Sequence, residues 1–235
     1  MRIPIAIAVL AALANILGAE MAEAHPARIV LLRHGEKKNG TELCSVGQLR
    51  AEALSAQYLG KGAPGNDTIF GQGGKPDAFF AITAHTQETA TPSAQTWGQQ
   101  LTLFPIPPHD PNEDPDLNTQ TKDAAKALTS SDYDGKIVVV VWKHKHIAKS
   151  DLNASGVTLW SLLNLGAIGN APVPDTWEGV NYDFFWIIDY TQGQPTFVSV
   201  PQQYVAHNYA KIPDNAWGAP VDQAKFPKFY GHCEQ

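Results

Sequence analysis

The chain has 235 residues, of which 43% are hydrophobic and 17% are charged. This composition is typical of a globular protein and excludes a disordered or collagen-like chain, and the length suits one sizeable α/β domain. The net charge of −6 provides no basic stripe for a nucleic-acid backbone, so we expect no nucleic-acid partner, whereas a small anionic ligand would need only a local cluster of cations.

The first residues have the features of a signal peptide. Arg2 gives a positive start, Ile3 to Leu17 is largely apolar, and residues 22–24 form an A-x-A cleavage site. We therefore expect a signal peptide at 1–24 and a mature domain at 25–235, located in the periplasm or outside the cell. The apolar run is short for a membrane span, so we expect no stable span after cleavage; an uncleaved anchor helix is the alternative.

Two cysteines, Cys44 and Cys233, remain in the mature chain. An oxidising compartment would allow them to form a disulfide that ties the C-terminal tail to the loop after the first strand. Two unrelated thiols are the alternative, and the distance between the residues decides between them.

Strand-like and helix-like segments alternate along the mature chain, which predicts a mostly parallel sheet with helices on both faces. In chain order, the expected strands are 27–32, 78–83, 136–142, 184–189 and 196–200. The expected helices are 45–59 with Ser45 as its cap, then 87–101, 122–128 and 147–165. Residues 60–76 and 104–121 are rich in glycine or proline and are expected to be loops, the second a lid or a mobile segment. Aromatic residues in the tail after Pro201 are expected to pack on the domain.

Polar residues follow three of the expected strands, where ligands bind in open α/β sheets. Arg33-His34-Gly35 follows the first strand, His85 the second and His144 the third. Neutral imidazole is a good nucleophile that can form a covalent intermediate, and guanidinium can grip phosphate oxygens in a bidentate manner. Glycine allows a tight turn and close approach of a substrate. These residues suit phosphoryl transfer, which depends on positioning and on surrounding cations.

The sequence resembles the histidine phosphatase superfamily, which includes the cofactor-dependent phosphoglycerate mutases and many broad phosphatases. The resemblance covers most of the mature chain, in order. It rests on Ile29 to Lys37 around the RHG motif, Ser45 to Leu54, Thr86 to Ala90, and the strand that ends in Trp142-Lys143-His144. It implies a three-layer α/β/α sandwich around a mostly parallel sheet, as in phosphoglycerate mutases.

The same resemblance implies roles for individual residues. His34 resembles the nucleophile that becomes phosphohistidine, and Arg33 the first phosphate-binding arginine. His144 resembles the second histidine, which supports the transferred phosphoryl group. Asn39 lies near the position of another phosphate contact in some relatives, although its spacing differs.

One position departs from the family pattern. Where relatives have a second phosphate-binding arginine, this chain has His85, which offers one donor and is mostly uncharged at neutral pH. If His85 replaces that arginine, activity should rise as pH falls, until His34 itself is protonated. Lys143 and Lys145 could compensate, but as residues that alternate with His144 we expect them to be solvated charges at the rim.

Hydrolysis of a phosphomonoester releases an alcohol, and its departing oxygen requires a proton donor. The resemblance places it after the second helix or after the second histidine. The candidates are Asp110, Glu113, Asp114 and Asp116, of which we select Glu113; Asp151 lies too far beyond His144.

The leading hypothesis is therefore an exported phosphomonoesterase that acts on a small phosphorylated substrate and needs no cofactor or metal. A degenerate family member that binds phosphorylated or anionic ligands without turnover is the main alternative, because of His85 and the unsettled acid. A zinc site that includes His144 and His146 is a further alternative, but Arg33 would repel the cation.

Overall fold

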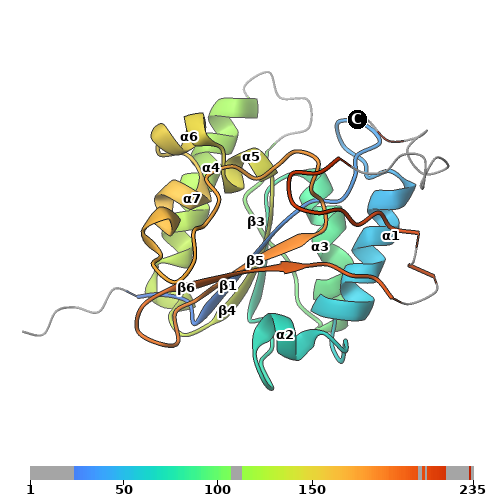
Figure 1. Cartoon of the computed structure of the whole chain (residues 1–235), viewed down its shortest axis with the longest axis horizontal. Helices are drawn as coiled ribbons and strands as arrows, with labels where there is room; N and C mark the ends of the chain where they lie inside the picture. Colours follow the sequence, from blue (N-terminus) through green and yellow to red (C-terminus); the bar gives the residue numbers. More distant parts are fainter. Residues whose placement is uncertain (1–23, 107–112, 206–207, 210, 221–232, 234–235) are drawn as a thin grey trace, which may run out of the picture.

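The computed structural model describes residues 24–106, 113–205, 208–209, 211–220 and 233, and a six-stranded sheet runs through its centre (Figure 1). The strands in order across the sheet are β3 (Thr102–Leu103), β2 (Ala78–Ala81), β4 (Ile137–Trp142), β1 (Arg28–Arg33), β5 (Phe184–Asp189) and β6 (Thr196–Pro201). Strand β5 is antiparallel to its neighbours β1 and β6, whereas the other pairings are parallel. The prediction of a mostly parallel sheet is confirmed.

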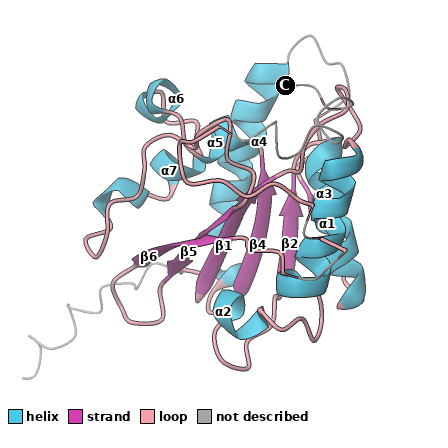
Figure 2. Ribbon diagram, turned by 45° about the vertical axis from the view of Figure 1, so that its right-hand side comes forward, coloured by secondary structure: helices cyan, strands magenta, loops and turns pink. Residues whose placement is uncertain are grey.

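Helices cover both faces of this sheet (Figure 2). One face carries α1 (Ser45–Leu54), which continues as a π-helix (Ser55–Leu59), together with α2 (Asn66–Phe70) and α3 (Ala84–Thr96). The other carries α4 (Glu113–Leu128), α5 (His144–Ile147) and α7 (Leu159–Leu162), with α6 (Ser150–Ala154) nearby. Short 3-10 helices span Ser131–Tyr133 and Leu165–Ala167. The expected three-layer sandwich is therefore the observed architecture.

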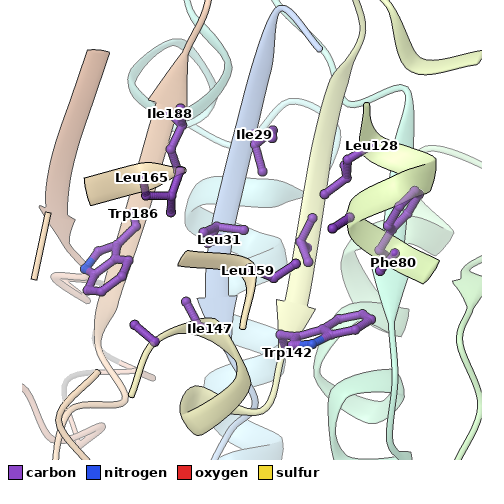
Figure 3. Close-up of a cluster of buried hydrophobic side chains, with 14 of the residues drawn as sticks. Ile29, Leu31, Phe80, Leu128, Trp142, Ile147, Leu159, Leu165, Trp186 and Ile188 are labelled. Atoms are coloured by element: carbon purple, nitrogen blue, oxygen red, sulfur yellow. The ribbon is translucent and has the colours of Figure 1, made fainter. Parts of the chain in front are cut away.

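The central strands read as continuous apolar runs because both of their faces are buried. Successive side chains of a strand point to opposite faces, so Val30 and Leu32 of β1 pack with α1 and α3. Ile29 and Leu31 point the other way, and Figure 3 shows them in the cluster that contains Trp142 of β4. This packing fixes the register of the strands, and with it the positions of the residues that follow them.

Several expected segments differ from the observed ones. The loop predicted at 60–76 contains α2, and the helix predicted at 87–101 is α3, which ends at Thr96 and is followed by the unexpected strand β3. The long loop predicted at 104–121 is wrong in its second half, because α4 begins at Glu113; Pro115 is tolerated in the first helical turn, where its missing N–H is not needed. The helix predicted at 147–165 is broken into α6 and α7, with Gly156 between them at φ 67°. Ser45 is the first residue of α1 and not its cap, since the N-cap is Cys44 without a side-chain hydrogen bond.

Residues at the two ends of the chain are only partly described. The expected signal peptide lies outside the described residues. In the tail, Trp217 packs against Trp177 and Trp186, with ring centroids 5.5 and 5.6 Å away, as expected of its aromatic residues. Within the described part of the chain, no helix is both long and apolar enough to cross a membrane.

Candidate active site

The strand ends that carry the predicted residues meet at one edge of the sheet. Strands β1 and β4 are parallel neighbours, with Arg33 opposite Trp142, so His34 and His144 follow strands that end side by side. A pocket of about 330 Å³ opens at this edge. Its lining residues are Arg33, His34, Lys37, Asp114, Leu117, Lys143, His144, Lys145, His146, Gly179 and Tyr182.

The ring of His34 is held in one orientation. Its Nδ1 lies 2.7 Å from the carbonyl oxygen of Gly35, and a proton on Nδ1 makes this a hydrogen bond that leaves the lone pair on Nε2. The residue is only 2% exposed. Burial, and then the positive charge of Arg33, lower the pKa of His34 well below its usual value. A neutral imidazole with a free Nε2 is the form that a nucleophile requires.

Arg33 is also buried, at 2% exposure. Its Nη1 donates to the carbonyl oxygen of Gly179 at 2.7 Å, and its guanidinium lies 3.6 Å from the ring centroid of Tyr182. Within the described residues, Nε of Arg33 has no hydrogen-bond partner. A buried donor without a partner is costly, and a guanidinium in the lining of a pocket is a suitable group for binding an anion.

His144 is the first residue of α5, and it too presents a buried polar atom. Its Nδ1 has no hydrogen-bond partner in the described part of the chain. Burial lowers the pKa of His144 to about 2, and the nearby Arg33 and Lys145 add to this effect. The histidine is therefore neutral without a ligand, and an anion in the pocket would favour its protonation.

The backbone after His34 is packed tightly against two helices. The Gly35 N–H donates to Oγ1 of Thr89 in α3 at 2.9 Å, and Thr89 Oγ1 in turn donates to the carbonyl oxygen of His85 at 2.7 Å. A Cβ atom on Gly35 would lie 2.8 Å from the carbonyl oxygen of Gly47 in α1. Glycine is therefore required here for close packing, in addition to any approach of a substrate.

A buried ion pair, absent from the sequence-based prediction, supports the same loop. Glu36 accepts two hydrogen bonds from Arg50 of α1, at 3.0 and 2.7 Å, and both residues are at most 2% exposed. Arg50 also donates to the carbonyl oxygen of Pro213 at 3.1 Å. The sequence carried one signal for this ion pair: Arg50 is a charged residue on the buried face of a helix, and such a residue must be paired.

His85 and Asn39, both predicted to bind phosphate, contact each other. Nε2 of His85 lies 2.8 Å from the carbonyl oxygen of Asn39, and the ring centroid of His85 is 5.5 Å from that of His34. The Asn39 side chain accepts from the N–H groups of Thr41 and Glu42 at 2.8 and 2.9 Å. Neither His85 nor Asn39 lines the pocket described above. Burial lowers the pKa of His85.

The candidate proton donors differ in their position relative to the pocket. Asp114, in the first turn of α4, lines the pocket. Glu113, our selection from the sequence, begins this helix, but its side chain and the whole of Asp110 lie outside the described residues. Asp116 does not line the pocket, and Asp151 is bonded to Lys149 on the surface. Among the described carboxylates, Asp114 is the one that lines the pocket.

Three lysines and a tyrosine complete the lining. Lys143 and Lys145 flank His144, and both belong to the pocket. Lys37 and Tyr182 also line it and were not predicted; Lys37 stands in the quoted motif, whereas no local pattern marks Tyr182.

The zinc alternative would require a group of metal ligands. Among the described residues, no three His, Cys, Asp or Glu side chains are grouped so that they could hold a metal ion.

Cys44 and Cys233 form a disulfide with a Cα–Cα distance of 5.4 Å. Cys44 is the N-cap residue of α1, and its N–H donates to the carbonyl oxygen of Glu36 at 2.9 Å. The bridge therefore joins the C-terminal tail to the loop that directly follows the candidate nucleophile.

No family model and no curated protein sequence matches the chain. Several solved structures are similar to it. A protein from Escherichia coli that is described as an α-ribazole-5′-P phosphatase is 15% identical, with a TM-score of 0.41, and 76% of this chain and 98% of that chain are covered. A protein described as mycobacterial hydrolase 1 is 16% identical, with a TM-score of 0.42 and coverage of 77% and 100%.

A phosphoserine phosphatase from Entamoeba histolytica, solved with 3-phosphoglyceric acid, is 13% identical, with a TM-score of 0.37 and coverage of 77% and 98%. The solved neighbours are members of the histidine phosphatase superfamily, the family that the sequence motifs resemble. At these scores, the function of this chain has to be inferred from the side chains at its own strand ends.

Proposed function

We propose that the protein is a phosphomonoesterase that acts through a phosphohistidine on Nε2 of His34. The observation that supports this most strongly is the contact of His34 Nδ1 with the Gly35 carbonyl, which leaves Nε2 as the reactive atom. Arg33 and His144 line the same pocket with buried polar atoms that lack a partner within the described residues. A phosphoryl group in this pocket would lie beside the positive charge of Arg33 and the ring of His144.

In the first step, Nε2 of His34 attacks phosphorus and the bond from phosphorus to the alcohol oxygen breaks. Asp114 in its acid form donates a proton to that oxygen, and the alcohol leaves. In the second step, water attacks the phosphohistidine and gives a proton to the Asp114 carboxylate. Inorganic phosphate and neutral His34 are released, so both proton and phosphoryl group are accounted for.

The test is hydrolysis of p-nitrophenyl phosphate by wild type, His34→Gln and Asp114→Asn. We expect His34→Gln to lose the activity. Rapid quench and mass spectrometry should detect a base-stable, acid-labile phosphoryl group on the wild type and none on His34→Gln. Asp114→Asn should slow alkyl phosphates more than p-nitrophenyl phosphate, because p-nitrophenolate leaves without a proton. If wild type and His34→Gln both fail to hydrolyse p-nitrophenyl phosphate, the proposal of a phosphomonoesterase is refuted.

One observation favours a second candidate, binding of phosphorylated or anionic ligands without turnover. His85 occupies the position of the expected second arginine, and its Nε2 is committed to the Asn39 carbonyl. This candidate predicts that inorganic phosphate binds with measurable heat in titration calorimetry, that Arg33→Met abolishes the heat, and that no phosphomonoester is hydrolysed.

We also propose that the protein works in the periplasm or outside the cell. The Cys44–Cys233 disulfide supports this, because such bridges persist in oxidising compartments. Fractionation of expressing cells should find the protein outside the cytoplasm with His25 as its first residue. An intact N-terminus in the cytoplasmic fraction would contradict it.

A further inference from the structure

We infer that Tyr182 is a positioning residue, whose ring fixes the plane of the Arg33 guanidinium beside the pocket. The inference rests on the proposed function, in which Arg33 binds the oxygens of the phosphoryl group. Tyr182 belongs to none of the sequence motifs that resemble the family, so it adds a residue on which the anion affinity of the site depends.

The ring of Tyr182 covers one face of the arginine. The guanidinium carbon of Arg33 lies 3.6 Å from the ring centroid of Tyr182, a distance at which a cation is attracted to an aromatic face. The tyrosine is half-buried and lines the pocket, and its ring also lies edge to face with that of His34, with the centroids 6.3 Å apart. Tyr182 therefore contacts the arginine at the point where it stands beside the nucleophile.

Hydrogen bonds hold only one corner of the guanidinium. Nη1 of Arg33 donates to the carbonyl oxygen of Gly179 at 2.7 Å and, over a longer distance of 3.4 Å, to that of Asn181. A planar group that is tethered at one nitrogen can still tilt about that nitrogen. A bidentate grip on phosphate oxygens requires a fixed plane, and contact with the ring removes this freedom to tilt.

The segment that carries Tyr182 is itself anchored. The side chain of the fully buried Asn181 donates to the carbonyl oxygen of Ala216 at 3.2 Å and accepts from the N–H of Gly218 at 2.7 Å. The Asn181 carbonyl oxygen also accepts from the indole N–H of Trp177 at 2.9 Å. Tyr182 therefore stands on a rigid support, as a residue that positions another one must.

The ring face of Tyr182, and not its hydroxyl group, makes the contact with Arg33. Within the described part of the chain, the hydroxyl group has no hydrogen-bond partner. Phenylalanine should therefore serve in its place. Leucine would fill part of the same space but has no aromatic face to offer a cation.

The experiment compares Tyr182→Leu with Tyr182→Phe, by kcat/KM for p-nitrophenyl phosphate and by the Kd of inorganic phosphate in titration calorimetry. Tyr182→Leu should lower kcat/KM and raise Kd by about tenfold each, the factor for loss of one well-oriented hydrogen bond to a charged group. Tyr182→Phe should recover most of both losses. If Tyr182→Phe loses as much as Tyr182→Leu, the hydroxyl group contacts the ligand directly and the inference is overturned.

A second background tests whether Tyr182 acts through Arg33. Arg33→Lys keeps the positive charge, but an ammonium group has no plane for the ring to orient. Added to Arg33→Lys, the substitution Tyr182→Leu should therefore cost about twofold or less in kcat/KM, because the effects of residues that act together do not add. An equal loss in both backgrounds would show that Tyr182 acts independently of the arginine and would overturn the inference.

Tyr133→Leu is the matched control. Tyr133 is also half-buried, and Nζ of Lys136 lies 5.5 Å from its ring centroid, but it packs on the core and does not line the pocket. This variant should be less stable in urea, yet keep the wild-type kcat/KM and phosphate Kd. If it loses as much activity as Tyr182→Leu, the losses reflect disturbed packing in general and the inference is overturned.

Failure of the inference is distinguishable from failure of the proposed function. If His34-dependent hydrolysis occurs but Tyr182→Leu keeps the wild-type kcat/KM and phosphate Kd, the inference is overturned and the phosphatase remains. If the wild type binds phosphate and hydrolyses nothing, the phosphatase is overturned, and the phosphate Kd of the two Tyr182 variants decides the inference. If the wild type neither hydrolyses p-nitrophenyl phosphate nor binds phosphate, both are overturned.

Discussion

Nδ1 of His34 lies 2.7 Å from the carbonyl oxygen of Gly35, so the nucleophile is oriented by the residue that follows it in the chain. The hydrogen bond requires a proton on Nδ1, and a second proton, on Nε2, would block the attack. Burial and Arg33 oppose that second proton by lowering the pKa of His34 well below its usual value. The reactive form therefore persists in acid.

The depressed pKa of His34 leads to a prediction for the pH dependence of the activity. An ordinary histidine would lose its nucleophilic form as pH falls through about 6.5. Because the pKa of His34 is depressed, kcat/KM for p-nitrophenyl phosphate should not decline as pH falls through that value. A pH–rate profile, with circular dichroism at each pH as control for folding, checks this. An acid limb with an apparent pKa near that of free histidine would contradict the depressed pKa.

The substitution His85→Arg tests whether the departure from the family pattern limits the rate. His85 is in the first turn of α3, its ring close to that of His34, and burial lowers its pKa, so it is neutral at neutral pH. An arginine would add a permanent charge to this side of the site. We expect kcat/KM at neutral pH to rise by about tenfold, as for one additional charge-assisted hydrogen bond.

His85→Gln is the matched control, because it keeps a donor near the Asn39 carbonyl but cannot become charged. It should keep the neutral-pH rate and lose any increase that the wild type shows in acid as His85 gains its proton. An unchanged rate and pH profile in His85→Arg would show that this position lies outside the phosphate site.

The strands were predictable because their sequences carry the signal of burial. The runs at 29–32 and 137–141 are apolar at every position, as a strand covered on both faces must be, so the sheet and the strand ends with His34 and His144 followed from the sequence. The start of α4 was not predictable, because Pro115 and its acidic neighbours are equally compatible with a loop and with a first helical turn.

The remaining parts of the site depend on contacts between distant residues. Tyr182, just before β5, stacks on Arg33 at the end of the neighbouring strand β1, and Arg50 of α1 pairs with Glu36. No local periodicity encodes either contact. The choice among neighbouring acids likewise depends on where α4 begins, because one step along a helix turns a side chain by about 100°.

Gly47→Ala tests the close approach of α1 to the loop after His34. A Cβ at this position would collide with the carbonyl oxygen of Glu36 and lie 2.8 Å from its amide nitrogen. Backbone atoms cannot give way cheaply, so we expect a loss of about 1–3 kcal/mol in the free energy of unfolding, as for an overpacked core. The activity should fall as well, because Gly35 is displaced with its neighbour. Chemical denaturation and kcat measure the two effects.

Gly169→Ala is the control for that substitution. Gly169 has ordinary backbone angles, and a Cβ there would meet nothing within 4 Å. The free energy of unfolding and the activity of the Gly169→Ala variant should match those of the wild type. A Gly47→Ala protein as stable as Gly169→Ala would show that α1 and the loop are not in tight contact.

The Cys44–Cys233 disulfide makes the stability of the protein depend on its redox state. The two residues are 189 positions apart, so the bridge removes a large loop from the unfolded ensemble. In the chain-entropy model such a bridge contributes about 5 kcal/mol. We expect the double variant Cys44→Ser/Cys233→Ser to lose about 2–5 kcal/mol in guanidinium unfolding, the usual range for removal of a native disulfide.

The same variant should bind substrate more weakly, because the Cys44 N–H is bonded to the Glu36 carbonyl and Lys37 follows directly. Loosening this loop would raise KM more than it lowers kcat, since His34 keeps its own contact with Gly35. Wild type treated with reductant is the control and should reproduce both effects, whereas reductant should leave the double variant unchanged. If reduced wild type keeps its stability and KM, the bridge supports neither the fold nor the loop that carries Lys37.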